Sequence, residues 1–307
     1  IAVTGLANAT AIAAGSYHTC ALLANGTVKC WGDNFYGQLG IGNNTGPQTC
    51  GGTACSTAPV QVSGITTATA IGAAEDRTCA LLANGTVKCW GRDDYVSALN
   101  TTSPVAVAGI ANATAVAVAP GFTCALLANG TALCLGLNSE GELGNGTTVD
   151  STTPVTVSGL TTAVALSAGA NHTCALLVNG TAKCWGWNIS GQIGDGTDTD
   201  ALTPAAVSGL TNAVAVAAGG YHSCALLLDG TAKCWGDDDN GQLGNGAGGY
   251  SFTPVAVASL GIVAGRTAIA AGGNHTCMLL VGGSAKCWGA NNAGQLGTGN
   301  TSGSLVP

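Results

Sequence analysis

Six segments of the chain repeat one pattern, in which two cysteines with nine residues between them enclose an Asn-Gly, Asp-Gly or Gly-Gly turn. The pairs are Cys20/Cys30, Cys79/Cys89, Cys124/Cys134, Cys174/Cys184, Cys224/Cys234 and Cys277/Cys287. A turn of this kind between two short apolar runs is typical of a β-hairpin. The pattern therefore restricts the chain to an internally repeated fold that is rich in β-strands.

The register of the first hairpin predicts a disulfide. A three-residue loop at Ala24-Asn25-Gly26, with the glycine in the left-handed conformation, places Cys20 opposite Cys30. The two cysteines then form a non-hydrogen-bonded pair, where antiparallel strands approach most closely, and this spacing suits a cross-strand disulfide. Buried free thiols or a metal site are the alternatives, but the sequence has no Cys-x-x-Cys and no second ligand pair at zinc spacing. We expect the other five hairpins to follow the same register.

Cysteine usage also predicts the compartment. The remaining pair, Cys50 and Cys55, lies in a Gly/Thr-rich insertion that we expect it to staple, so that all fourteen cysteines are used. Because the chain begins at Ile1 rather than at Met, we expect an extracellular or cell-surface protein whose signal peptide has been removed. No apolar run approaches the roughly 20 residues of a membrane helix, so no membrane span is predicted.

Charge is scarce in this sequence. Charged residues make up 7% of the chain, and the net charge is −7 with only eight Lys plus Arg, whereas a typical soluble domain has roughly 25% charged residues. Since no basic patch is present, nucleic acid is not an expected partner. A surface so poor in charge needs another source of solubility.

Asparagine sequons offer that source. Thirteen Asn-x-Ser/Thr sequons are candidates for N-linked glycans: Asn8, Asn25, Asn43, Asn84, Asn100, Asn112, Asn129, Asn145, Asn171, Asn179, Asn188, Asn274 and Asn300. Four of them, Asn25, Asn84, Asn129 and Asn179, have an alternative explanation. They sit in the hairpin turn, where Asn is favoured for backbone reasons and Thr for its strand propensity.

The repeat unit indicates a β-propeller. Each unit holds four short apolar segments separated by Gly, Pro or Asn-Gly turns, which predicts a four-stranded antiparallel meander. The first cysteines of successive hairpins are 59, 45, 50, 50 and 53 residues apart. Four-strand units that recur about every 50 residues are typical of propeller blades.

The motifs within each unit resemble the regulator of chromosome condensation repeat family along the whole chain. Ala-Ala-Gly-x-x-His-Thr recurs at Gly15/His18, Gly169/His172, Gly219/His222 and Gly272/His275. Gly-Gln-Leu-Gly follows at Gly37–Gly40, Gly241–Gly244 and Gly294–Gly297. The second unit departs from the pattern at Glu75-Asp76-Arg77 and lacks the turn between Asp93 and Asn100, and the third has Phe122 for His and Leu135 for Trp. The resemblance implies a propeller, with a usual ring of seven blades.

The sequence contains six repeat units, one fewer than the seven blades of the usual ring. We predict an all-β fold, a single six-bladed β-propeller over residues 1–307, with repeats centred on the hairpins 20–30, 79–89, 124–134, 174–184, 224–234 and 277–287. The chain begins with Ile1–Leu6, which resembles the recurring Pro-Val-x-Val strand without its proline, and ends at Pro307, where the next such strand would begin. We therefore expect the N-terminal strand to complete the last blade and close the ring. The alternative is that these residues are part of a longer propeller or array.

Several repeated side chains invite a functional interpretation. His18, His172, His222 and His275 occupy equivalent positions, and we expect structural hydrogen bonds rather than a metal site. The tryptophans after the second cysteines, Trp31, Trp90, Trp185, Trp235 and Trp288, are expected to pack between blades rather than to stack on sugars, whereas Trp187 lies outside the pattern and is expected to be exposed. The clusters Asp237–Asp239 and Asp195, Asp198 and Asp200 carry oxygen ligands suited to calcium, but neither fits the usual loop spacing, so we expect solvated loops.

No catalytic residue, metal ligand or cofactor site is predicted, because no nucleophile motif and no phosphate-binding loop occurs. Two non-enzymatic functions remain. The first is an extracellular structural protein, N-glycosylated and self-associating, of a cell surface, fibre or filament. The second is a secreted binding module, an adhesin or inhibitor, since the resemblance implies protein partners. For this second function the irregular loops at Cys50–Cys55 and Asp93–Ala98 are the candidate contact sites.

Overall fold

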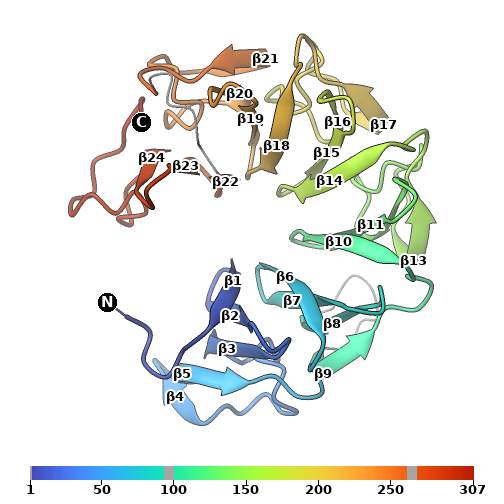
Figure 1. The fold of residues 1–307 in the computed structure, drawn as a ribbon, viewed down its shortest axis with the longest axis vertical. Coiled ribbons are helices and arrows are strands. Elements are labelled where there is room, and N and C mark those ends of the chain that lie inside the picture. Colours follow the sequence, from blue (N-terminus) through green and yellow to red (C-terminus); the bar gives the residue numbers. More distant parts are fainter. Residues whose placement is uncertain (1, 93–99, 261–267) are drawn as a thin grey trace. The chain divides into compact units, whose positions relative to one another are not determined.

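The chain folds into strands arranged as propeller blades. The computed structural model describes residues 2–92, 100–260 and 268–307, and its described elements are 24 β-strands in six antiparallel sheets (Figure 1). Each sheet contains one cysteine-bracketed hairpin, so the all-β, six-bladed propeller predicted from the repeat is confirmed. In the described part of the chain, no helix has the length and apolarity needed to cross a membrane.

The first three blades follow one another along the chain. The first has the strand order β1-β2-β3-β5-β4, and the next two have the orders β6-β7-β8-β9 and β10-β11-β12-β13. Their bounds are β1 Ala9–Ala14, β2 His18–Leu23, β3 Val28–Asp33, β4 Gln48–Cys50, β5 Thr53–Gln61, β6 Ala68–Ala74, β7 Arg77–Leu82, β8 Val87–Gly91, β9 Thr101–Ala106, β10 Ala113–Val118, β11 Phe122–Leu127, β12 Ala132–Gly136 and β13 Ser151–Thr156.

The last three blades repeat the same plan. Their strand orders are β14-β15-β16-β17, β18-β19-β20-β21 and β22-β23-β24. The bounds are β14 Ala163–Ala168, β15 His172–Leu177, β16 Ala182–Gly186, β17 Ala201–Ala206, β18 Ala213–Ala218, β19 His222–Leu227, β20 Ala232–Asp237, β21 Tyr250–Ala256, β22 Ala268–Ala271, β23 His275–Leu279 and β24 Ala285–Gly289.

These strands belong to two compact units. The first unit comprises Ile1–Leu137 with Asp150–Val155, and the second comprises Asn138–Val149 with Thr156–Pro307. The first unit holds the first three blades, apart from Thr156 at the end of β13, and the second unit holds the fourth, fifth and sixth blades. Within each unit the first strand of one blade packs against the next blade, as β1 does against β6 and β14 against β18.

The hairpin register agrees with the sequence-based prediction. Cys20 lies opposite Cys30, and the other five hairpins have the same pairing. Gly26 in the first turn has φ 78°, which is the left-handed conformation that glycine adopts without steric cost. Local turn geometry therefore brings the two cysteines of each hairpin face to face.

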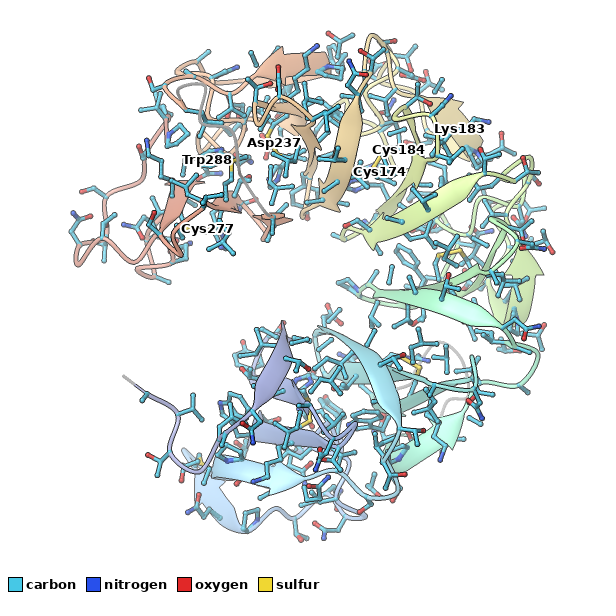
Figure 2. The ribbon with its side chains drawn as sticks, viewed as in Figure 1. Cys174, Lys183, Cys184, Asp237, Cys277 and Trp288 are labelled. Atoms are coloured by element: carbon cyan, nitrogen blue, oxygen red, sulfur yellow. A yellow bond between two sulfur atoms is a disulfide. The ribbon has the colours of Figure 1, made fainter. Side chains whose placement is uncertain are left out.

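Each of these cysteine pairs is a disulfide within its own blade. The two Cα atoms are 4.0 or 4.1 Å apart in all six, and Figure 2 labels one pair, Cys174 and Cys184. The six disulfides join Cys20 to Cys30, Cys79 to Cys89, Cys124 to Cys134, Cys174 to Cys184, Cys224 to Cys234, and Cys277 to Cys287. Cys134 and Cys234 are fully buried, whereas Cys287 in the last blade is half-buried.

Hydrophobic cores lie between consecutive blades. In the second unit one core cluster contains the disulfide Cys174–Cys184 of the fourth blade, Ile193 from the following turn and Trp235 from the fifth blade, all fully buried. This core therefore joins one blade to the next, with larger residues such as Ile193 and Trp235 filling the space between the sheets.

The residues at the N-terminus are not assigned to a strand. Residues 2–8 are in turns and extended segments without strand pairing, with Gly5 at φ 76°, and Ile1 lies outside the described residues. In the last blade, Gly289 forms an antiparallel bridge with Ser304. This bridge matches the pairing of Gly236 with Ser251 in the fifth blade, so the C-terminal segment itself begins the outer strand. Because Ile1–Leu6 and the last blade belong to different compact units, the expectation that this segment completes that blade stays a prediction.

Candidate functional site

A cleft of about 740 Å³ lies on the first blade, with Asp76 of the second blade among its lining residues. Four aromatic side chains line it: Tyr17, just before β2, Trp31 on β3, and Phe35 and Tyr36 on the loop after β3. Tyr17 is 76% exposed and Phe35 is 56% exposed, which is unusual for side chains of this size. Phe35 and Tyr36 pack edge to face, with ring centroids 4.9 Å apart.

The cysteine-stapled insertion forms one side of the cleft. Cys50 and Cys55 are joined by a disulfide, and β4 and β5 form a hairpin in which Cys50 pairs with Thr53. Cys50, Thr53 and Cys55 all line the cleft. The structure therefore places this predicted contact loop at the cleft, whereas most of the second one, Asp93–Ala98, falls in 93–99, outside the described residues.

The hairpin cysteines do not contribute to this cleft. All fourteen cysteines lie within the described residues, and Cys50 and Cys55 are the two that line it. Cys134 on β12, Cys234 on β20 and Cys287 on β24 are each the second cysteine of a hairpin disulfide in the third, fifth and sixth blades. Their role is therefore to cross-link two strands of one blade, and they are structural residues rather than parts of a binding site.

A buried glutamine amide organises the polar part of the cleft. Gln38 belongs to the Gly-Gln-Leu-Gly turn, and its side chain is fully buried. Its Nε2 donates hydrogen bonds to Asp33 Oδ2 at 2.8 Å and to Asp76 Oδ1 at 3.1 Å, and its Oε1 accepts one from the Tyr36 amide at 2.9 Å. One side chain thus holds two carboxylates of the cleft and one of its aromatic residues.

The electrostatics of the cleft favour a cationic or hydrogen-bonding ligand group. Burial raises the pKa of Asp76, the neighbouring Asp33 charge raises it further, and Arg92 opposes both effects. The Arg92 guanidinium lies 5.2 Å from the centroid of the Tyr36 ring, an arrangement in which the aromatic face attracts the cation. The cleft therefore combines carboxylate acceptors with aromatic faces that accommodate cations or apolar groups.

Trp31 differs from the other repeated tryptophans. Trp90, Trp185, Trp235 and Trp288 are at most 1% exposed, as predicted for packing between blades. Trp31 is only half-buried and lines the cleft. The Gly-Gln-Leu-Gly turn of the first blade packs on Trp90 instead, whose Nε1 donates to Gln38 O at 2.9 Å. Trp31 therefore forms part of the cleft wall, and its packing between blades stays a prediction.

The repeated histidines make hydrogen bonds to the next blade. His18 Nε2 is 2.7 Å from Thr78 Oγ1, and His172 and His222 make the equivalent contacts to Ser223 and Thr276 at 2.8 Å. Burial lowers the pKa of His172 to about 4, so the imidazole is neutral at physiological pH. No cluster of three or more His, Cys, Asp or Glu side chains with metal-binding geometry occurs among the described residues.

The sequon asparagines differ in accessibility. Ten are exposed, Asn145 and Asn171 are half-buried, and Asn188 is fully buried. The Asn188 Nδ2 donates to the carbonyl oxygens of Thr197 and Thr199 at 3.0 and 2.9 Å, so we expect this side chain to be structural and to carry no glycan. The four hairpin-turn asparagines share another geometry. In the first of them, Asn25 Oδ1 accepts from the Thr27 amide and hydroxyl.

The two predicted acidic clusters are not alike. Asp198 is exposed, in agreement with a solvated loop, whereas Asp195 and Asp200 are half-buried and accept hydrogen bonds from the Thr197 and Asn188 amides. Asp237 and Asp238 are 8% and 2% exposed, so the prediction of a solvated loop is wrong for these two residues. Trp187, expected to be exposed, is half-buried and packs edge to face on Tyr221 at 5.3 Å.

Sequence reasoning missed most of the cleft residues. Tyr17, Phe35, Tyr36 and Asp33 were not singled out, because none of them is a fixed position of a repeated motif, and Asp76 was noted only as a departure from the repeat. A signal was nevertheless present. The chain has 14 aromatic residues of the Phe, Trp and Tyr types, and four of them fall within residues 17–36.

Comparison with protein families gives matches along most of the chain. A model described as Regulator of chromosome condensation (RCC1) repeat matches residues 25–81, 129–176, 179–226 and 229–279. A second model with the same description matches residues 9–38, 69–95, 163–192, 213–242 and 267–295. A comparison with curated protein sequences found no significant match.

Solved structures show the same fold. Yeast RCC1 (Prp20), crystallised with Kap60, matches with a TM-score of 0.82 and 22% identity over 97% of this chain and 73% of that chain. Human WBSCR16 matches with a TM-score of 0.84 and 21% identity over 97% and 81%. The CRINKLY WD40 ectodomain of the Arabidopsis thaliana receptor kinase ACR4 matches with a TM-score of 0.53 and 18% identity over 97% and 82%.

At these identities the structural likeness concerns the fold alone, whereas one repeat model covers more than half of the residues. The repeats, the six sheets and the family match agree. The chain therefore belongs to the Regulator of chromosome condensation (RCC1) repeat family, in a form with a disulfide in every blade.

Proposed function

We propose that the protein is a non-enzymatic extracellular binding module that holds a segment of another protein in the aromatic cleft of its first blade. The observation that carries this proposal is the cleft itself, where exposed Tyr17 and Phe35 stand beside the disulfide-stapled β4–β5 hairpin. Exposed aromatic side chains next to fixed polar groups are typical of binding hot spots. The chain has seven disulfides, and the described residues include no free cysteine, which supports an extracellular setting.

Relatives support a protein as the partner. Yeast RCC1 was crystallised with Kap60 bound, and Prp20p from Saccharomyces cerevisiae is described with binding properties to Gsp1p and histones. These partners are described for the relatives and are not assigned to this chain. For this chain we infer only the class, a polypeptide that offers a cationic side chain to Asp33 and Asp76 and apolar groups to the aromatic walls.

Photo-cross-linking in native surroundings tests the cleft. A photoreactive phenylalanine analogue replaces Phe35 in one variant, and it replaces Val178 in the control. Val178 is 70% exposed beside the hairpin turn of the fourth blade. We expect a discrete protein adduct from position 35 only. An adduct with a second copy of this chain would identify self-association as the use of the cleft, and equal adducts from both positions, or none, would contradict the proposal.

Alanine variants give the energetic test once the adduct has been identified. Tyr17→Ala and Phe35→Ala are expected to weaken binding of the partner about tenfold or more, because truncation of an anchoring aromatic residue removes more than about 1.4 kcal/mol. Val178→Ala serves as the matched control and is expected to leave the affinity unchanged.

The second candidate function is a glycosylated structural protein of a surface or fibre. The exposure of ten sequon asparagines favours it. In the hairpin turns, the Asn Oδ1 is occupied by the Thr amide and hydroxyl, as for Asn84 with Thr86, which leaves Nδ2 as the group available for a sugar. Electron microscopy of native material distinguishes the two functions, since a structural role requires ordered assemblies and isolated monomers would count against it.

A further inference from the structure

The fifth blade carries an aspartate at a buried position where other blades have asparagine. This equivalent position in each blade is defined by one hydrogen bond, in which the side-chain Oδ1 accepts from the backbone amide five residues later. Asn34, Asn138, Asn188 and Asn291 make this bond at 2.8 to 3.0 Å. Asp238 Oδ1 makes it to Leu243 N at 2.8 Å. Asp238 therefore occupies the asparagine position of the repeat.

The asparagine amide nitrogen has a defined role at this position. In the third, fourth and sixth blades, Nδ2 donates to the carbonyl oxygens nine and eleven residues later. Asn188 does so to Thr197 O and Thr199 O, and Asn291 to Asn300 O and Ser302 O, all at 2.9 or 3.0 Å. The amide therefore ties down the loop that follows. An ionised carboxylate has no hydrogen to donate and cannot replace it.

In Asp238, the carboxylate oxygen Oδ2 replaces the amide nitrogen Nδ2 of the asparagine. Its side chain is 2% exposed, and Oδ2 is buried without a hydrogen-bond partner among the described residues. Counting nine and eleven residues on, the corresponding carbonyls are those of Ala247 and Gly249. Gly249 O accepts a hydrogen bond from Asp238 N at 2.6 Å, so the loop does close over this residue. By the repeat, this oxygen stands where the asparagine amide nitrogen meets the loop carbonyls, and a buried carboxylate oxygen there needs either a proton or a positive partner.

The charges around Asp238 strengthen that requirement. Burial raises the pKa of Asp238 to about 6, the hydrogen bond from Leu243 opposes this, and the charges of Asp237 and Asp239 raise it again. With such a pKa the group is mostly ionised at neutral pH. Asp237, labelled in Figure 2, is itself nearly buried, with Oδ2 accepting from Gln242 Nε2 at 2.8 Å. Three adjacent carboxylates thus share this loop.

We propose that Asp238 Oδ2 binds a calcium ion, which takes the place of the asparagine amide group and holds the loop at Ala247–Gly249. Calcium accepts six to eight oxygen ligands, including carboxylates, backbone carbonyls and water. Asp238 supplies the buried carboxylate, the loop supplies carbonyl oxygens, and Asp237 and Asp239 add negative potential. The usual calcium-loop spacing is absent because the repeat, rather than a linear motif, brings the carbonyls to the carboxylate.

Thermal unfolding with calcium or with a chelator tests the site. For the wild-type chain we expect saturating Ca²⁺ to raise Tm by about 5 °C over the chelated protein. For Asp238→Asn we expect no calcium shift and a Tm in chelator at or above that of the wild type, because the amide restores the repeat's hydrogen bonds. Titration calorimetry with Ca²⁺ is expected to show one site on the wild-type chain and at least about tenfold weaker binding in the variant.

Asp198→Asn is the matched control, because it removes the same charge from an exposed loop, and it is expected to keep the full calcium shift. The proposal is overturned if wild-type Tm is the same in calcium and in chelator. In that case, a wild-type stability that rises relative to Asp238→Asn as pH falls below about 6 would identify a protonated Asp238 that donates to the loop. A calcium shift that survives in Asp238→Asn places the ion elsewhere and overturns the proposal equally.

Discussion

Single carbonyl oxygens hold neighbouring blades together. Gln242 O in the turn of the fifth blade accepts from Trp288 Nε1 and from Thr276 Oγ1 of the sixth blade, both at 2.9 Å. Because the Thr276 hydroxyl donates its hydrogen to this carbonyl, we assign it as the acceptor from His222 Nε2, 2.8 Å away. His222 is then the Nε2–H tautomer, which leaves its buried Nδ1 as the atom without a hydrogen-bond partner in the described residues.

Removal of the shared hydroxyl is expected to destabilise this contact. Thr276→Val preserves shape but leaves His222 Nε2–H buried without its acceptor, which costs about 1–3 kcal/mol. The free energy of unfolding in urea measures the effect. Thr211→Val, at an exposed position, is the control and is expected to stay within about 0.5 kcal/mol of the wild type. Equal values for the two variants would rule out the hydrogen-bond assignment.

The buried histidines predict sensitivity to acid. Burial, with smaller contributions from the positive charges of His172 and His275, lowers the pKa of His222 to about 3, against 6.5 in the unfolded chain. The unfolded state therefore binds the proton first as pH falls, so the contribution is fully present above about pH 7 and is progressively lost from pH 6.5 down to the folded pKa. His222→Gln is expected to unfold with a shallower pH dependence between pH 6.5 and 4, by about one proton, and an unchanged slope would contradict the neutral assignment.

Residue roles were only partly predictable from the sequence. Packing of Trp185 and hydrogen bonding of His172 follow from their repeated positions, since equivalent residues meet equivalent neighbours. Burial of Asn188 was not predicted, because the same asparagine fits both a glycosylation sequon and a structural position of the repeat. Asp238 looked like a member of a solvated acidic run, and only the hydrogen bonds of the other blades show that it replaces an asparagine.

Each blade contains one hairpin with a disulfide across its two strands. The register follows from local rules alone, because turn length and the left-handed glycine fix which residues face each other. The β4–β5 insertion was predictable as a stapled loop but not as a cleft wall, since its position depends on non-local contacts. Two departures from the repeat, in neighbouring blades, were visible together in the sequence. The third blade has Leu135 for Trp, and the second blade lacks the turn that would receive a tryptophan.

Loss of one hairpin disulfide is expected to weaken a blade without unfolding it. Cys174→Ser/Cys184→Ser removes a cross-link over a separation of 10 residues and is expected to lower the free energy of unfolding by at most about 2–3 kcal/mol. Far-UV circular dichroism is expected to keep its β-sheet signal. Complete loss of that signal would mean that the disulfide, and not the core between blades, holds the strands.

The stapled insertion is expected to respond differently. Cys50→Ser/Cys55→Ser frees the tip of β4–β5, where Cys50 is half-buried at the edge of the sheet. We expect little change in the free energy of unfolding and weaker capture of the cleft partner by the cross-linker at position 35. A large loss of stability with unchanged cross-linking would assign this disulfide to the fold instead of the site.

Across the whole chain, the surface combines few charges with many exposed apolar side chains. Only 7% of residues are charged, whereas Tyr17, Leu228 and Val178 are 76%, 75% and 70% exposed. Such a surface favours association, unless another polar group covers it. Val178 immediately precedes the exposed Asn179, so a glycan at that asparagine would lie beside an exposed apolar side chain.

Glycan mapping of native material tests this interpretation through a matched pair in one blade. Asn179 and Asn188 are both sequons of the fourth blade, but Asn179 is exposed and Asn188 is fully buried. Peptide mass spectrometry is expected to find sugar on Asn179 and none on Asn188. Enzymatic removal of N-glycans is then expected to lower the concentration at which the protein precipitates, because apolar patches lose their hydrated cover. If no sequon carries sugar, the Asn-Gly-Thr sequences are explained by turn formation alone. Glycan on Asn188 would mean that sugar transfer precedes folding of this blade.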